Sequence, residues 1–171
     1  PPIRDRAHQD ALWRALDRGV VDVMGSDHAP HTAEEKTKAY PDSPSGIPGV
    51  QTMLPLMLDH AANGRLSLER VVDLLAAGPA RVYNIARKGR IAAGFDADLA
   101  LVDLNAERRI TADWLASKAG FSPFLDRRVR GWPVATMVRG RVVARDGQVL
   151  GAPAGRPVRF LETLDAQAGT A

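Results

Sequence analysis

Cysteine is absent from the 171 residues, which excludes disulfide bonds, thiolate catalysis and any zinc site with cysteine ligands. No apolar run approaches the roughly 18–20 residues of a membrane-spanning helix, so we expect no membrane association. Aromatic residues make up only 5% of the chain, and the 23 Lys and Arg residues are scattered. The sequence therefore shows no pattern typical of nucleic-acid binding, and its net charge of +3 is modest.

The first residues, Pro1-Pro2-Ile3-Arg4-Asp5-Arg6, carry neither an initiator Met nor the apolar centre of a signal peptide. We therefore expect a cytoplasmic protein whose beginning is missing from this chain. The residues that are present have an ordinary globular composition, 45% hydrophobic and 25% charged, and are numerous enough for a sizeable core.

Residues 1–87 have the helix and strand pattern of an α/β protein. Apolar residues at helical spacing predict helices over 5–16, 50–62 and 68–77, with Gly78 ending the third, and over 79–85. Residues 20–24 predict a buried strand, and the long loop over 26–49 follows it directly. Functional loops of α/β barrels follow the strands in this way, so we interpret this region as the last strand, active-site loop and C-terminal helices of a TIM-type (β/α)8 barrel.

Residues 88–151 have a different pattern, which predicts a small β-sandwich module. Strands are expected over 99–102, 134–138 and 141–144, with hairpin turns at Arg139-Gly140 and Asp146-Gly147 and a short helix around Trp114. Residues 152–171 are expected to form a tail. A barrel of this type needs eight parallel strands, and only one is predicted here, so we expect the chain to be incomplete. The predicted fold class is α/β, made of the C-terminal end of the barrel and the β module.

Asp27, His28 and His31 are the candidate site residues from spacing alone. A carboxylate just after a strand can bind a divalent metal and take a proton from water, and imidazoles can bind metal or anionic groups. A lone Asp at this position is more often a turn residue, and a lone His is more often structural, as we interpret His8 and His60. Spacing alone leaves the two explanations evenly balanced.

Short strings along almost the whole chain resemble those of one family. They are Asp27-His28-Ala29-Pro30-His31 with Gly25-Ser26 before it and Glu34-Glu35-Lys36 after it, Ser45-Gly46-Ile47-Pro48-Gly49, Gly78-Pro79-Ala80-Arg81, Gly131-Trp132-Pro133, Pro1-Pro2-Ile3-Arg4, and the stretch from Gly89 to Asp98. Together they resemble class I dihydroorotases of the amidohydrolase superfamily, and this chain resembles their C-terminal part. The Asp-His-Ala-Pro-His string matches the motif that follows their eighth barrel strand.

The resemblance implies a role for each matching residue. Asp27 is implied as a metal ligand and as the catalytic group that first accepts and then donates a proton. His31 is implied to bind the carboxylate side of the substrate, and Ser45 and Gly46 to offer backbone groups to the pyrimidine ring. His28 is not implied as a ligand. The implied cofactor is Zn²⁺, one or two ions per full-length subunit, which lowers the pKa of a bound water toward ~7 and polarises the carbonyl.

The implied reaction is the reversible cyclisation of N-carbamoyl-L-aspartate to L-dihydroorotate in de novo pyrimidine (UMP) biosynthesis. In the family, the other metal ligands, among them a His-x-His pair, lie upstream of the position of Pro1. We therefore expect the 171 residues alone to bind zinc poorly and to show no turnover. The partners that the resemblance implies are a second copy of the subunit or aspartate transcarbamoylase.

Two alternatives stay open. A hydantoinase or allantoinase shares the fold and the aspartate at position 27, but usually differs around Ala29-Pro30-His31. A non-catalytic dihydroorotase-like subunit of aspartate transcarbamoylase keeps the fold and loses metal ligands, and the presence of Asp27 and His31 argues against it. A free-standing β-rich binding module would leave the Asp27 loop unexplained.

Overall fold

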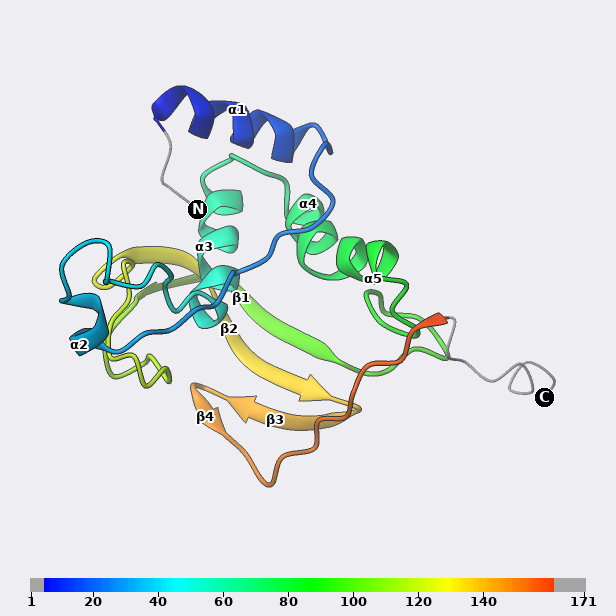
Figure 1. The fold of residues 1–171 in the computed structure, drawn as a ribbon. Helices are drawn as coiled ribbons and strands as arrows, with labels where there is room; N and C mark the ends of the chain where they lie inside the picture. The colour runs from blue at the N-terminus through cyan, green and yellow to red at the C-terminus, as the bar shows by residue number, and fades with distance from the viewer. Residues whose placement is uncertain (1–4, 162–171) are drawn as a thin grey trace.

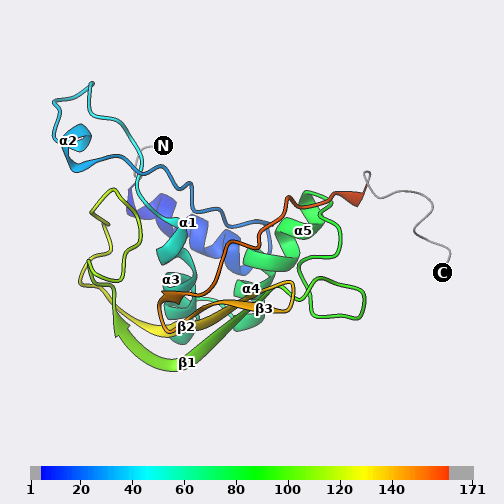
Figure 2. The same cartoon turned by 90° about the horizontal axis from the view of Figure 1, so that it is seen from below.

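The computed structural model describes residues 5–161, so Pro1-Pro2-Ile3-Arg4 and the last ten residues of the predicted tail lie outside it. Figure 1 shows helices and one antiparallel sheet with the strand order β1-β2-β3-β4. The elements are α1 (Arg6–Asp17), α2 (Ala33–Lys36), α3 (Val50–Ala62), α4 (Leu68–Val72), the π-helix η1 (Asp73–Ala77), α5 (Gly78–Val82), β1 (Leu99–Arg109), β2 (Arg128–Val138), β3 (Arg141–Arg145) and β4 (Gln148–Val149). Figure 2 shows α1, α3, α4 and α5 on one side of the sheet. None of the described helices has the length and apolarity that a membrane crossing requires.

Helix α1 confirms the predicted first helix. Asp5 caps it, because its carboxylate accepts the His8 backbone N–H at 3.2 Å. Leu16 joins the main core, whose other buried members are Met57, Leu66, Val71 and Leu74. The Trp13 ring lies 4.4 Å from the His60 ring of α3, so the structural interpretation of His60 agrees with its contacts. Burial lowers the pKa of His60, and the charges of Arg127 and Arg65 lower it further.

The prediction of a strand over residues 20–24 is wrong. The segment is irregular and pairs with no other described strand, and Val20 is 72% exposed. Val21 and Met24 still pack against the core, and the Met24 N–H donates to the Leu74 carbonyl at 3.0 Å. The apolar pattern therefore identified the buried side chains. A β-strand also needs another strand along its edge, and the described neighbour of residues 20–24 is the helix that contains Leu74 and Gly78.

The expectation that Gly78 ends a helix is wrong. The Ser67 hydroxyl accepts the Arg70 N–H at 3.1 Å and starts α4, which passes through η1 directly into α5. Gly78 has a helical φ of −59°. A Cβ at this position would lie 2.1 Å from the Asp22 carbonyl oxygen. The glycine therefore allows the helix to pack closely against the segment that leads to Asp27, and the helix expected over 79–85 ends at Val82.

The sheet confirms both predicted hairpins. Arg139 and Gly140 have φ of 50° and 76°, as a tight turn between β2 and β3 requires, and Asp146-Gly147 joins β3 to β4. Strands β1 and β2 extend beyond the apolar runs that predicted them, because pairing continues through polar residues as far as Arg109 and Arg128. Trp114 lies in a turn and not in the expected helix, with its ring 4.6 Å from that of Trp132.

Helix α3 joins the sheet to the rest of the molecule. Gly131 on β2 has a φ of 97°, and a Cβ there would lie 2.6 Å from the Cβ of Leu58. Asp59, which is 9% exposed, accepts the Arg130 backbone N–H at 3.0 Å and pairs with Arg127 at 3.3 Å. The described residues of the β region thus form one sheet packed on a helix.

The described part of the tail returns to the end of α5. The Ala86 N–H donates to the Arg159 carbonyl and the Leu161 N–H to the Asn84 carbonyl, each at 2.8 Å. These bonds hold residues 159–161 beside residues 84–86.

The close approach at Gly78 generates a stability prediction. In Gly78→Ala the new methyl group collides with backbone, which cannot move aside as a flexible side chain can, so we expect the free energy of unfolding to fall by about 1–3 kcal/mol. Urea denaturation of the purified protein measures this change. Gly155→Ala is the matched control, because a Cβ at Gly155 meets open space. Equal stability of the two variants would contradict the packing role of Gly78.

Candidate functional site

Asp27 lies three residues after Met24, which is anchored to η1. Its φ is 45°, a left-handed conformation that Asp tolerates better than most residues, and the residue is exposed. Just before it, the backbone passes close to Gly49, where a Cβ would lie 2.7 Å from the Ser26 carbonyl oxygen. The carboxylate of Asp27 is therefore presented at the surface on a backbone that packs against the start of α3.

The end of the long loop returns to Asp27. Ile47 forms a parallel β-bridge with His28, and the Ala29 N–H donates to the Ile47 carbonyl at 3.1 Å. Gly46 has a φ of 119°, and a Cβ there would lie 2.7 Å from both the Cβ and the carbonyl oxygen of Ala29. The structure thus brings Ser45 and Gly46 beside the Asp27 motif, while the roles of these residues stay predictions.

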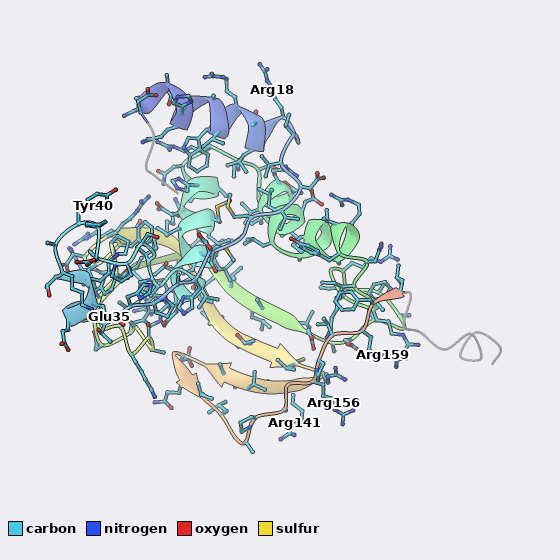
Figure 3. All side chains as sticks on the ribbon, viewed as in Figure 1. Arg18, Glu35, Tyr40, Arg141, Arg156 and Arg159 are labelled. Carbon is cyan, nitrogen blue, oxygen red and sulfur yellow. The ribbon has the colours of Figure 1, made fainter. Side chains whose placement is uncertain are left out.

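His31 lies at the entrance to α2. Its Nδ1 is 3.5 Å from Glu35 Oε2, and 30% of its side chain is exposed. Glu35 also forms a capping box with Thr32: it accepts the Thr32 backbone N–H at 2.8 Å, and its own N–H donates to the Thr32 hydroxyl at 3.2 Å. Figure 3 shows Glu35 and Tyr40 at the end of the molecule that lies away from Arg156 and Arg159.

The capping box changes the acidity of Glu35. The bond from the Thr32 backbone N–H is the main cause that lowers the pKa of Glu35 below its ordinary 4.5, burial raises it, and the Thr32 hydroxyl and His31 lower it further. A carboxyl with a lowered pKa in the folded state stabilises the fold above its ordinary pKa, and this contribution is lost as the pH falls through the lowered value. The pattern Thr32-x-x-Glu35 is the sequence signature of such a box and could have indicated α2, a helix that lies within the predicted loop.

His28 has a clear structural role. Its Nδ1 accepts the backbone N–H groups of Gly49 and Val50 at 3.1 and 3.3 Å. Gly49, the N-cap residue of α3, makes no side-chain cap of its own, so an imidazole from the Asp27 motif caps this helix instead. Nδ1 can accept only when it carries no proton. This contact fits the expectation that His28 is not a metal ligand.

The described residues supply few ligands for the predicted zinc ion. Residues 5–161 contain no group of three or more His, Asp or Glu side chains that could hold a metal ion. Asp27 is the one predicted ligand among them, and one carboxylate does not make a zinc site, which takes three or four protein ligands. The described residues therefore do not fit a metal site by themselves.

Two substitutions test whether the Nδ1 atom of His28 caps α3. Asn places a polar atom near the position of Nδ1, whereas Gln places one near Nε2. If His28 acts as the cap of α3, we expect His28→Asn to keep most of the stability and His28→Gln to lose about 1 kcal/mol, the usual value of an N-cap. Chemical denaturation of both variants measures this. If His28→Gln is the more stable variant, the cap role is wrong.

Comparison with known proteins identifies the family. The profile of the amidohydrolase family matches residues 4–143. A protein named dihydroorotase from Halobacterium salinarum is 48% identical over 159 residues, which cover 93% of this chain and 37% of that protein. An L-hydantoinase from Paenarthrobacter aurescens is 41% identical over 155 residues, covering 88% of this chain and 34% of that protein.

Among solved structures, the L-hydantoinase (dihydropyrimidinase) from Arthrobacter aurescens matches with a TM-score of 0.83 at 41% identity, over 88% of this chain and 35% of that one. The chain thus spans about a third of the length of these relatives. The resemblance that the Asp27 motif indicated is confirmed by the named dihydroorotases, and the chain belongs to the amidohydrolase family.

Proposed function

We propose that the protein containing this chain is a dihydroorotase, which reversibly cyclises N-carbamoyl-L-aspartate to L-dihydroorotate. The observation that carries the proposal is the pairing of the Asp27 motif with the Ser45–Gly46 segment through the bond from Ala29 to Ile47. This pairing puts a surface carboxylate beside a backbone segment, which suits a reaction that moves a proton on a ring carrying N–H and C=O groups. The 48% identity to a named dihydroorotase supports it.

Each residue has one task in this proposal. The Asp27 carboxylate accepts a proton from the attacking water in the hydrolytic direction and delivers it to the leaving ring nitrogen. The backbone groups of Ser45 and Gly46 hydrogen-bond the ring. His31, oriented by the Glu35 carboxylate 3.5 Å from its Nδ1, donates to the substrate carboxylate.

The finer features of the fold are part of the same proposal. Residues 20–24, which pair with no described strand, would become the last strand of a TIM-type barrel once strands from outside residues 5–161 lie beside them, and residues 88–151 would be part of a β-sandwich module. Zn²⁺ would be held by Asp27 together with ligands outside residues 5–161, and would supply an activated water. The protein acts in the cytoplasm in pyrimidine biosynthesis, as a homodimer or with aspartate transcarbamoylase.

A hydantoinase is the second candidate, because an L-hydantoinase is 41% identical in sequence and matches the structure with a TM-score of 0.83. The ring of hydantoin needs the same proton transfer and the same backbone contacts as dihydroorotate, but it lacks a ring carboxylate. His31 with Glu35 therefore favours dihydroorotate as the substrate.

The test of the proposed function uses the full-length protein with its natural metal. We expect turnover of dihydroorotate to exceed that of hydantoin and allantoin, measured by the loss of ring absorbance. Preferential turnover of hydantoin would make the second candidate correct, and turnover of none of the three would contradict a cyclic amidohydrolase. The isolated 171 residues are expected to show no turnover.

Asp27→Asn tests the proton transfer. We expect a loss of at least about 10³-fold in kcat with an unchanged thermal midpoint, because the amide keeps the shape of the side chain and cannot accept the proton. Asp42→Asn, an exposed carboxyl on the same loop, is the matched control and should keep full activity. An active Asp27→Asn enzyme would show that another group moves the proton.

A further inference from the structure

Lys36 holds the end of the long loop. It is the last residue of α2, and its Nζ donates to the Pro44 carbonyl at 2.7 Å and to the Gly46 carbonyl at 3.2 Å. The loop also donates a hydrogen bond to the backbone of Lys36, from the Ser43 hydroxyl to the Lys36 carbonyl at 3.2 Å. Three hydrogen bonds thus close the loop from residue 36 to residue 46.

The bonds of Lys36 are charge-assisted and lie in a half-buried environment. Hydrogen bonds to a charged group are about twice as strong as neutral ones. A lysine ammonium has three donors, and two of them go to backbone carbonyls two residues apart. A lysine that only contributes surface charge makes no such pair of bonds to the backbone. The geometry therefore indicates that the conformation of residues 44–46 depends on the Lys36 side chain.

Helix α2 carries both of its loop contacts on neighbouring residues. Glu35 contacts His31, and Lys36 contacts Gly46. Gly46 in turn packs against Ala29, two residues before His31. One short helix therefore connects the two sides of the segment that the proposed function assigns to the substrate.

We propose that Lys36 is a positioning residue that holds the Ser45–Gly46 backbone at the correct distance from Asp27 and His31; this rests on the proposed function. The Gly46 carbonyl is occupied by the lysine. Ring recognition then falls to the other backbone groups of Ser45 and Gly46: the Ser45 carbonyl can accept from a ring N–H, and the two N–H groups can donate to a ring C=O.

The role predicts a specific kinetic change in the full-length enzyme. Lys36→Met keeps an unbranched side chain as far as Cε and removes the Nζ donor, and with it both bonds. Because Lys36 does not touch the reacting atoms, we expect KM for dihydroorotate to rise about tenfold, with a change in kcat of less than about threefold. Lys38→Met, an exposed lysine of the same loop, is the matched control and should leave KM unchanged.

Hydrogen exchange followed by mass spectrometry gives a second readout that needs no substrate. We expect the amides of residues 27–29 and 45–47 to exchange about tenfold faster in Lys36→Met, since the bond from Ala29 to Ile47 loses its support, while the amides of α3 keep their rates. Lys36→Gln, a milder change that replaces the ammonium with an uncharged NH₂ donor on a shorter side chain, should give an intermediate rate and serves as the test if Lys36→Met does not fold.

The outcomes separate the two proposals. Faster exchange together with a higher KM supports the positioning role. Unchanged exchange overturns it, whatever the kinetics, as does faster exchange with an unchanged KM or a loss confined to kcat. If the unsubstituted protein turns over neither dihydroorotate nor hydantoin, the proposed function is wrong, and the exchange rates still decide whether Lys36 holds the Ser45–Gly46 segment.

Discussion

The hydrogen bond from the Ala29 N–H to the Ile47 carbonyl is the contact on which the candidate site depends. It joins the Asp27 motif itself to the far end of a loop with little regular structure. It forms only because Gly46 has no side chain, since a Cβ would collide with Ala29. The two segments could otherwise vary their separation freely, and a backbone that recognises a ring needs a fixed distance from the group that moves the proton.

Helix α3 carries this arrangement to the rest of the molecule. At its start, the imidazole of His28 caps the backbone N–H groups of Gly49 and Val50. Near its end, the buried Asp59 accepts the Arg130 N–H of β2. The candidate site and the sheet are thus attached to opposite ends of one helix. A shift of the sheet would move α3 and, through His28, the backbone of the Asp27 motif, so the β region has a positional role even without a residue in the site.

Local rules predicted much of the fold and less of the site. Helices α1 and α3 and both hairpins were predicted, because periodicity, caps and turn residues act over a few neighbours. Residues 20–24, Gly78 and Trp114 were misinterpreted, because the features that decide them come from distant segments: a strand partner, a close backbone contact and the neighbouring Trp132 ring. Spacing made Asp27 a candidate but left its role open until the family resemblance, and Gly46 stood out only through that resemblance. No local pattern indicated that the His28 ring caps a helix after residue 49.

Dihydroorotases and hydantoinases resemble this chain almost equally, and the chemistry of its residues explains why. Both kinds of ring are cyclic amides, and in the proposed function each is served by a carboxylate that moves a proton and by a backbone segment that binds ring N–H and C=O groups. Asp27, Ser45 and Gly46 would serve either ring. The two substrates differ in the ring carboxylate, which in the proposed function meets His31, the residue that Glu35 of α2 contacts. On that proposal, selection between the two reactions falls on His31 and its contact with α2, and the rest of the segment can stay the same for both rings.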